Sequence, residues 1–162
     1  MAQSNAWLTL VRMVGQKIVA FLPRLILKRF YPLEALAAHI DIDVRNLEFR
    51  LDDVPRAYLW LRITNRSPYV DIQVHHVFVD IWDTQPLGKL STSERDVIPR
   101  CTRPKKAALC DADLTDAQVR RLRQQKETSE EFMCHIRAVF ESALGSVEWR
   151  DTIRGVRARF VG

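Results

Sequence analysis

Two long segments alternate between apolar and polar residues, and each shifts its phase by one residue near its middle. In residues 38–52 the apolar positions are first even and then odd, with the change at Arg45-Asn46, and residues 69–82 repeat the pattern with a change at His75-His76. Period-two alternation is typical of a strand with one buried face, and a slip of one residue turns the apolar set to the other face. We therefore expect two long strands, each with a bulge or a passage between two sheets at its middle.

Shorter apolar segments separated by turns account for most of the remaining chain. Further strands are expected within residues 57–65, 97–98, 107–110, 132–143 and 147–160, with turns at 65–68 and 85–88. The helical signal in this part is at residues 115–126, where Thr115 and Gln118 have the spacing of a capping box. About seven strands, one short helix and no alternation of strand with helix predict an antiparallel β-sandwich of the immunoglobulin or fibronectin type.

The first part of the chain has a different period. Between residues 7 and 31, at 100° per residue, the apolar side chains gather on one side and most bases on the other, which predicts a basic amphipathic helix that Pro23 kinks or divides. We expect two domains, a helical segment of residues 1–37 and a β-sandwich of residues 38–162. The predicted contact residues of the helix are Trp7, Val11, Val14, Ile18, Phe21, Leu22 and Leu25 on the apolar side, with Arg12, Lys17, Arg24 and Lys28 on the basic side.

The charge of the chain is concentrated in this segment. Residues 1–36 carry five bases and one acid, whereas the remainder is close to neutral, so the net charge of +5 is mostly local. The segment has no uncharged run near the roughly 20 residues that a membrane crossing needs, and a secretory signal would require a basic start that MAQSNAW lacks. The helix is therefore expected in the membrane interface, in a groove of a partner, or across one end of its own domain.

The stretch LWLRITNRSPYVDIQVHHVFVDIW at residues 59–82 is followed by a QPLG turn, an edge strand, the helix LTDAQVRRL and a closing hairpin. In this order of elements the chain resembles the group 2 late embryogenesis abundant proteins, also called water stress and hypersensitive response domains, over residues 38–162. The family often has Asn-Pro where this chain has Asn65-Arg66. The resemblance implies a fibronectin-like sandwich without catalytic residues and, in many members, an N-terminal membrane segment.

Candidate chemical groups do not form a known constellation in the sequence. His75-His76 has no H-x-H or C-x-x-C partner motif, so we expect a role at the strand bend and no metal site. The three cysteines lack the paired spacing of a disulfide framework or a zinc site, which indicates reduced thiols, with Cys134 buried and Cys101 exposed. No phosphate loop and no nucleophile motif occurs. We therefore expect a protein that is not an enzyme and has no cofactor.

The expected function is that of an adaptor or stress-protective domain, cytoplasmic and peripheral to a membrane, tethered to an anionic surface by its helix. Nucleic acid fits poorly as a partner, because the bases lie in the most apolar stretch and the second basic stretch, residues 100–126, contains no aromatic residue. Two other functions stay open. The chain could be a subunit of a larger assembly that docks through the helix, or a carrier of an apolar or lipid ligand.

Overall fold

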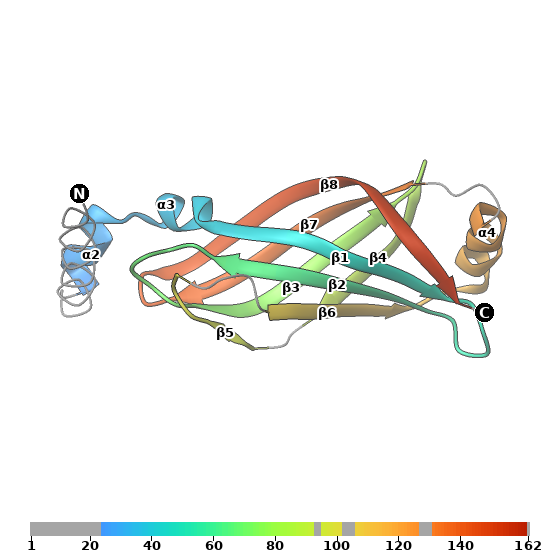
Figure 1. The fold of residues 1–162 in the computed structure, drawn as a ribbon, viewed down its shortest axis with the longest axis horizontal. Coiled ribbons are helices and arrows are strands. Elements are labelled where there is room, and N and C mark those ends of the chain that lie inside the picture. Colours follow the sequence, from blue (N-terminus) through green and yellow to red (C-terminus); the bar gives the residue numbers. More distant parts are fainter. Residues whose placement is uncertain (1–23, 93–94, 102–105, 127–130, 162) are drawn as a thin grey trace, which may run out of the picture.

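A computed structural model of the chain describes residues 24–92, 95–101, 106–126 and 131–161, and Figure 1 shows their arrangement. The helices are α2 (Arg24–Phe30), α3 (Leu33–Ala38) and α4 (Asp116–Lys126). The strands are β1 (Ile40–Arg50), β2 (Arg56–Asn65), β3 (Ile72–Trp82), β4 (Pro86–Thr92), β5 (Val97–Ile98), β6 (Lys106–Asp113), β7 (Glu131–Ser142) and β8 (Gly145–Val161).

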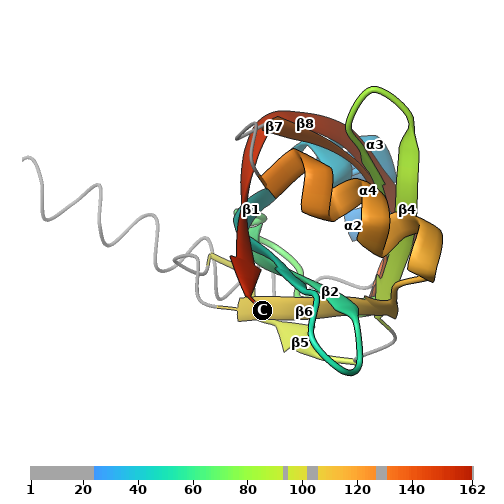
Figure 2. The ribbon, with the colours of Figure 1, turned by 90° about the vertical axis from the view of Figure 1, so that its right-hand side faces the viewer.

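Seven of the described strands form a closed β-barrel. Hydrogen-bonded neighbours follow the order β4-β6-β2-β1-β8-β7-β3, and a pairing between β3 and β4 closes the ring, while β5 pairs with the start of β3. Figure 2 looks along the barrel and shows the strands around its interior. The predicted antiparallel immunoglobulin-like sandwich is therefore wrong, because a sandwich consists of two separate sheets, whereas here one mixed sheet closes on itself.

Two strands bring about this closure. The end of β8 returns to β1 and pairs with it in parallel, with Leu47 opposite Ala158 and Arg50 opposite Val161. The strand can turn there because Gly155 has a φ of +71°, a left-handed conformation that favours glycine, in a bulge of β8 opposite β7. On the other side β4, which was expected only as a turn, pairs with both β3 and β6.

Both phase slips in the sequence are bulges in the structure. The register of β1 with β2 shifts between Val44 and Asn46, and the register of β3 with β7 shifts between Val74 and His76. Bulges increase the local twist and bend of a strand, which a barrel needs and a flat sheet does not. The prediction of mid-strand bulges is confirmed, although the bends serve a barrel.

The inside of the barrel is a packed hydrophobic core, and short helices close its two ends. Leu47, Leu59 and Phe140 are fully buried within the ring, while Leu36 of α3 and Leu122 of α4 are fully buried at opposite ends. The core cluster also includes Leu27 and Tyr31, from the last part of the predicted N-terminal segment. The domain boundary at residue 38 stays a prediction.

The helix α4 is attached to the barrel by polar contacts at the β3–β4 turn. The capping box is confirmed, since the Thr115 amide donates to Gln118 Oε1 at 2.7 Å and the Gln118 amide donates to Thr115 Oγ1 at 3.4 Å. The side chain of Asp83 is 1% exposed and accepts hydrogen bonds from Arg121 and Gln125 of α4. Burial raises the pKa of Asp83, but the hydrogen bonds and the charge of Arg121 outweigh it and hold the pKa below its usual value.

Candidate functional site

The first candidate surface is the described end of the basic N-terminal segment. Figure 1 shows α2 beyond α3, at the end of the barrel opposite α4. Leu27 of α2 is buried, whereas Ile26 is 41% exposed and Phe30 is 77% exposed. Positions 26 and 30 are four residues apart, so their side chains lie on one face of the helix. Lys28 and Arg29 are exposed in the same helix. We call Ile26, Lys28, Arg29 and Phe30 the α2 surface.

The opposite side of this segment is fixed to the barrel through Tyr31. Its ring makes an edge-to-face contact with the Tyr69 ring at a centroid distance of 4.9 Å, and its hydroxyl oxygen lies 3.0 Å from Nδ1 of His39. That nitrogen is also 2.6 Å from the carbonyl oxygen of Ala35. Burial raises the pKa of the Tyr31 phenol above its ordinary value. These contacts hold the α2 surface in a set orientation relative to the barrel.

Most residues predicted to form the membrane or partner contact lie outside the described residues. Of that set, Lys28 is described as an exposed side chain of α2, and Arg24 and Leu25 are placed in the backbone of the same helix. Those outside are Trp7, Val11, Arg12, Val14, Lys17, Ile18, Phe21 and Leu22. Among the described helices none is long and apolar enough to cross a bilayer.

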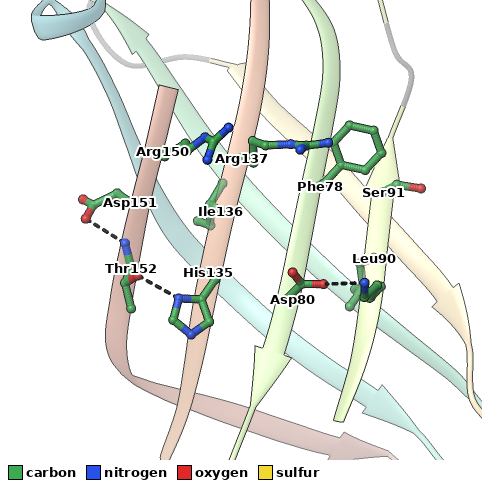
Figure 3. Close-up of a pocket in the computed structure, with 11 residues that line it drawn as sticks. Phe78, Asp80, Leu90, Ser91, His135, Ile136, Arg137, Arg150, Asp151 and Thr152 are labelled. Atoms are coloured by element: carbon green, nitrogen blue, oxygen red, sulfur yellow. Dashed lines mark hydrogen bonds and ion pairs between the residues drawn. The ribbon is translucent and has the colours of Figure 1, made fainter. Parts of the chain in front are cut away.

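The second candidate surface is a groove of about 690 Å³ on the outer wall of the barrel, where β4, β3, β7 and β8 lie side by side (Figure 3). We call it the outer groove. Its upper part in Figure 3 is formed by Phe78, Arg137 and Arg150, and its lower part by Asp80, His135 and Thr152. The groove therefore combines an exposed aromatic ring, two guanidinium groups, a carboxylate, an imidazole and a hydroxyl group.

The two arginines are direct cross-strand partners. Arg137 of β7 is in register with Arg150 of β8, and their side chains are 52% and 68% exposed. Both approach one carboxylate oxygen of Glu148, at 3.6 Å from Arg137 and 2.9 Å from Arg150. The guanidinium carbon of Arg137 also lies 4.8 Å from the centre of the Phe78 ring, a cation–π contact (Figure 3).

The lower part of the groove is held by contacts among its own side chains. Nδ1 of His135 lies 2.8 Å from Oγ1 of Thr152, and the His135 ring meets the edge of Trp82 at a centroid distance of 5.7 Å. Nζ of Lys89 is 4.0 Å from a carboxylate oxygen of Asp80. This network orders the imidazole and sets the shape of that end of the groove.

The sequence contains a signal for the arginine pair. A tight hairpin turn between β7 and β8 fixes the register of the residues from the turn up to the bulge at Phe132/Cys134, and this register sets Arg137 opposite Arg150. Phe78 belongs to the polar phase of β3, where an aromatic residue is out of pattern. Its position on the polar phase predicts that Phe78 is exposed, on the same outer face as the two arginines.

Of the other predicted chemical groups, His76 lies next to the outer groove, with its ring centroid 5.8 Å from that of Phe78. Nδ1 of His75 is 3.7 Å from a carboxylate oxygen of Glu141, and no group of three or more possible metal ligands occurs among the described residues. Cys134 is buried, as predicted, and burial raises its pKa to about 12. Cys101 is exposed, also as predicted.

No protein-family model and no curated protein sequence matches the chain. Among solved structures, a structural-genomics target determined by X-ray crystallography has 13% identity over 75% of this chain and 89% of its own, with a TM-score of 0.45. A protein from Archaeoglobus fulgidus has 8% identity over 71% of this chain and 94% of its own, with a TM-score of 0.42.

A third solved structure is that of a candidate late embryogenesis abundant protein. It has 13% identity over 92% of this chain and 89% of its own, with a TM-score of 0.34. The resemblance noted in the sequence thus has a distant counterpart among solved structures.

Proposed function

We propose that the chain is a non-enzymatic, cytoplasmic β-barrel domain, an adaptor or stress-protective protein, that is held at an anionic membrane surface by its N-terminal segment. The observation that carries this proposal is the composition of the α2 surface. Phe30 is 77% exposed and Ile26 is 41% exposed on one helix face, in a helix that also exposes Lys28 and Arg29. Exposed apolar side chains next to bases are typical of helices that lie in the headgroup region of a membrane.

The geometry of α2 supports an interfacial position. At 100° per residue Arg29 lies beside the stripe formed by Ile26 and Phe30, and Leu27 lies on the side that faces the barrel. The apolar side chains can therefore enter the lipid while Arg29 remains at the level of the phosphate groups. Since Leu27 and Tyr31 belong to the barrel core, contact through α2 would also orient the barrel.

The charge contribution can be estimated. A base near an anionic membrane surface contributes about 1 kcal/mol of binding free energy. Arg29 lies beside the apolar stripe, whereas Lys28 lies on the opposite side of the helix at 100° per residue. Replacing both by glutamine should thus cost about 1–2 kcal/mol, which is a roughly 5- to 30-fold lower partition coefficient. The loss should decrease as salt concentration rises, because salt screens exposed charges.

The test is co-sedimentation of the full chain with phosphatidylcholine vesicles that contain phosphatidylserine, compared with vesicles of phosphatidylcholine alone. Full-length variants are better suited than a truncation, because a chain that began after α3 would lack the buried side chains of Leu27, Tyr31 and Leu36. We expect that K28Q/R29Q lowers binding to the anionic vesicles and that I26S/F30S lowers binding to both.

The matched charge control is R120Q/R154Q, which removes two exposed arginines from α4 and β8. The apolar control is Val54→Ser, which replaces a 67% exposed side chain in the β1–β2 connection. Both controls should bind vesicles like the unmodified chain. Equal binding of the α2 variants and the controls would contradict the proposal.

A further inference from the structure

We propose that the outer groove binds a small organic anion, in which a phosphate or carboxylate group is joined to a flat apolar group. The oxyanion would lie between Arg137 and Arg150, and the flat group would lie against Phe78. This site is on the barrel wall and is separate from the α2 surface.

The first argument is the placement of like charges. Arg137 and Arg150 are in register on neighbouring antiparallel strands, an arrangement that destabilises a sheet unless an anion compensates the charges. Glu148 is the carboxylate that the two guanidinium groups share, through a single oxygen. One carboxylate balances one of the two positive charges. Counted over Arg137, Arg150 and Glu148 alone, one positive charge remains, while Asp80, Asp151 and Lys89 line other parts of the groove.

The second argument is the donor geometry of Arg137. A guanidinium group over an aromatic ring makes a cation–π contact with the ring, and its five N–H groups are donors for other partners. Its carbon lies 4.8 Å from the centre of Phe78. The contact also limits the motion of a long side chain that is 52% exposed. An oxyanion can then accept parallel hydrogen bonds from a donor that is already oriented.

The third argument is the exposed ring itself. Phe78 is 39% exposed on the outer wall, while its neighbours Val77 and Val79 are fully buried. A ligand with a flat apolar group and an oxyanion can contact Phe78 and the arginine pair at the same time. The groove volume of about 690 Å³ is within the range of small-molecule sites, which is about 300–1,000 Å³.

The lower part of the groove determines the orientation in which the ligand would bind. Asp80 lies in that part and would repel a second anionic group, whereas Arg137 and Arg150 are at the other side of the groove (Figure 3). A ligand with a single oxyanion end is thus favoured over one with anionic groups at both ends.

The test is a titration of the full chain with phenyl phosphate, benzoate and inorganic phosphate, followed by two-dimensional amide NMR. We expect saturable shifts of the amide signals of Phe78, Arg137 and Arg150 at millimolar concentrations, and binding of phenyl phosphate about tenfold tighter than that of inorganic phosphate. Tighter binding of phenyl phosphate than of benzoate would assign the site to phosphates, and the reverse order would assign it to carboxylates.

Three variants separate a ligand site from a merely structural arginine pair. Arg150→Gln should weaken phenyl phosphate binding about tenfold, and Phe78→Ser should remove the preference over inorganic phosphate. Glu148→Gln should strengthen binding several-fold, because it removes the carboxylate that competes for both guanidinium groups. Arg154→Gln, an exposed arginine of the same strand, is the control and should bind like the unmodified chain.

The proposal would be overturned by the absence of saturable shifts with both phenyl phosphate and benzoate. Affinities that do not change in Arg150→Gln, or that decrease in Glu148→Gln, would overturn it as well. None of these outcomes bears on vesicle binding by the α2 surface, so the two proposals fail independently.

Discussion

Asn65 is a buried side chain that joins three segments at the end of β2. Its amide nitrogen donates to the carbonyl oxygens of Val70 at 2.9 Å and Ile98 at 3.2 Å, and its side-chain oxygen accepts the amide of Ser67 at 3.0 Å. The residue is fully buried. Asn65→Ala would leave these three backbone groups without their partner in a place that water does not reach.

The magnitude follows from the number of bonds. A buried hydrogen bond contributes about 1 kcal/mol net, and an unsatisfied buried group costs about 1–3 kcal/mol. Asn65→Ala should therefore lower the free energy of unfolding by about 3 kcal/mol, which for a chain of this size is a decrease in Tm of about 6–12 °C. Asn65→Asp should cost more at neutral pH, because a carboxylate cannot donate and would face two carbonyl oxygens.

The assay is urea unfolding followed by far-ultraviolet circular dichroism, with the free energy obtained by linear extrapolation. The matched control is Asn46→Ala, since Asn46 is exposed at the bulge of β1. It should change stability by less than about 0.5 kcal/mol. If the two alanine variants lost equal stability, the reasoning from buried hydrogen bonds would be refuted.

Three further predictions concern pH, thiol reactivity and the helix cap. Folding lowers the pKa of Asp83, and such a carboxyl group contributes stability above its unfolded pKa that is lost as the pH falls. Acidification through the usual pKa of 3.8 should therefore destabilise the unmodified chain more than Asp83→Asn. Urea unfolding at several pH values measures the difference. Because burial raises the pKa of Cys134 to about 12, iodoacetamide at pH 8 should modify Cys101 in the native protein and reach Cys134 only after unfolding, as shown by mass spectrometry. Gln118→Ala, which removes the bonds to Thr115 and to the barrel, should lower the free energy of unfolding by about 1–2 kcal/mol, whereas Gln124→Ala on the exposed side of α4 should not.

Much of the secondary structure could be predicted from residues close together in the sequence. The bulges at Val44/Asn46 and Val74/His76 were visible as phase slips, because a strand with one buried face alternates apolar and polar residues along the sequence. The capping box at Thr115 was visible for the same reason, since its hydrogen bonds span three residues.

The strand β4 was missed because its local pattern is not that of a strand. Its buried residues Leu87 and Leu90 are three positions apart, and Pro86 and Gly88 are more typical of a turn. The helix α3 lies within the predicted helical segment of residues 1–37 but was not predicted as a separate helix, since six residues are too few to show a helical period and Leu36 is buried by the barrel end. Without β4 the remaining strands fit a sandwich better than a closed ring.

The two candidate surfaces also differ in how far the sequence could predict them. The apolar and basic character of the N-terminal segment is a property of consecutive residues and could be read directly. The outer groove requires Phe78, Arg137 and Arg150 to meet from three strands, so it depends on two registers at once.

The sequence by itself determined most of the strands, though not β4, as well as where two of them bulge and where α4 begins, since these depend on side chains within a few residues of one another. Only the tertiary structure decided that β8 returns to β1, which brings Leu47 beside Ala158, and that β4 completes the ring. The physical reason is that strand pairing uses backbone hydrogen bonds, which are alike at nearly every residue. Which edges meet is therefore set by the accumulated twist, bends and core packing of the whole chain.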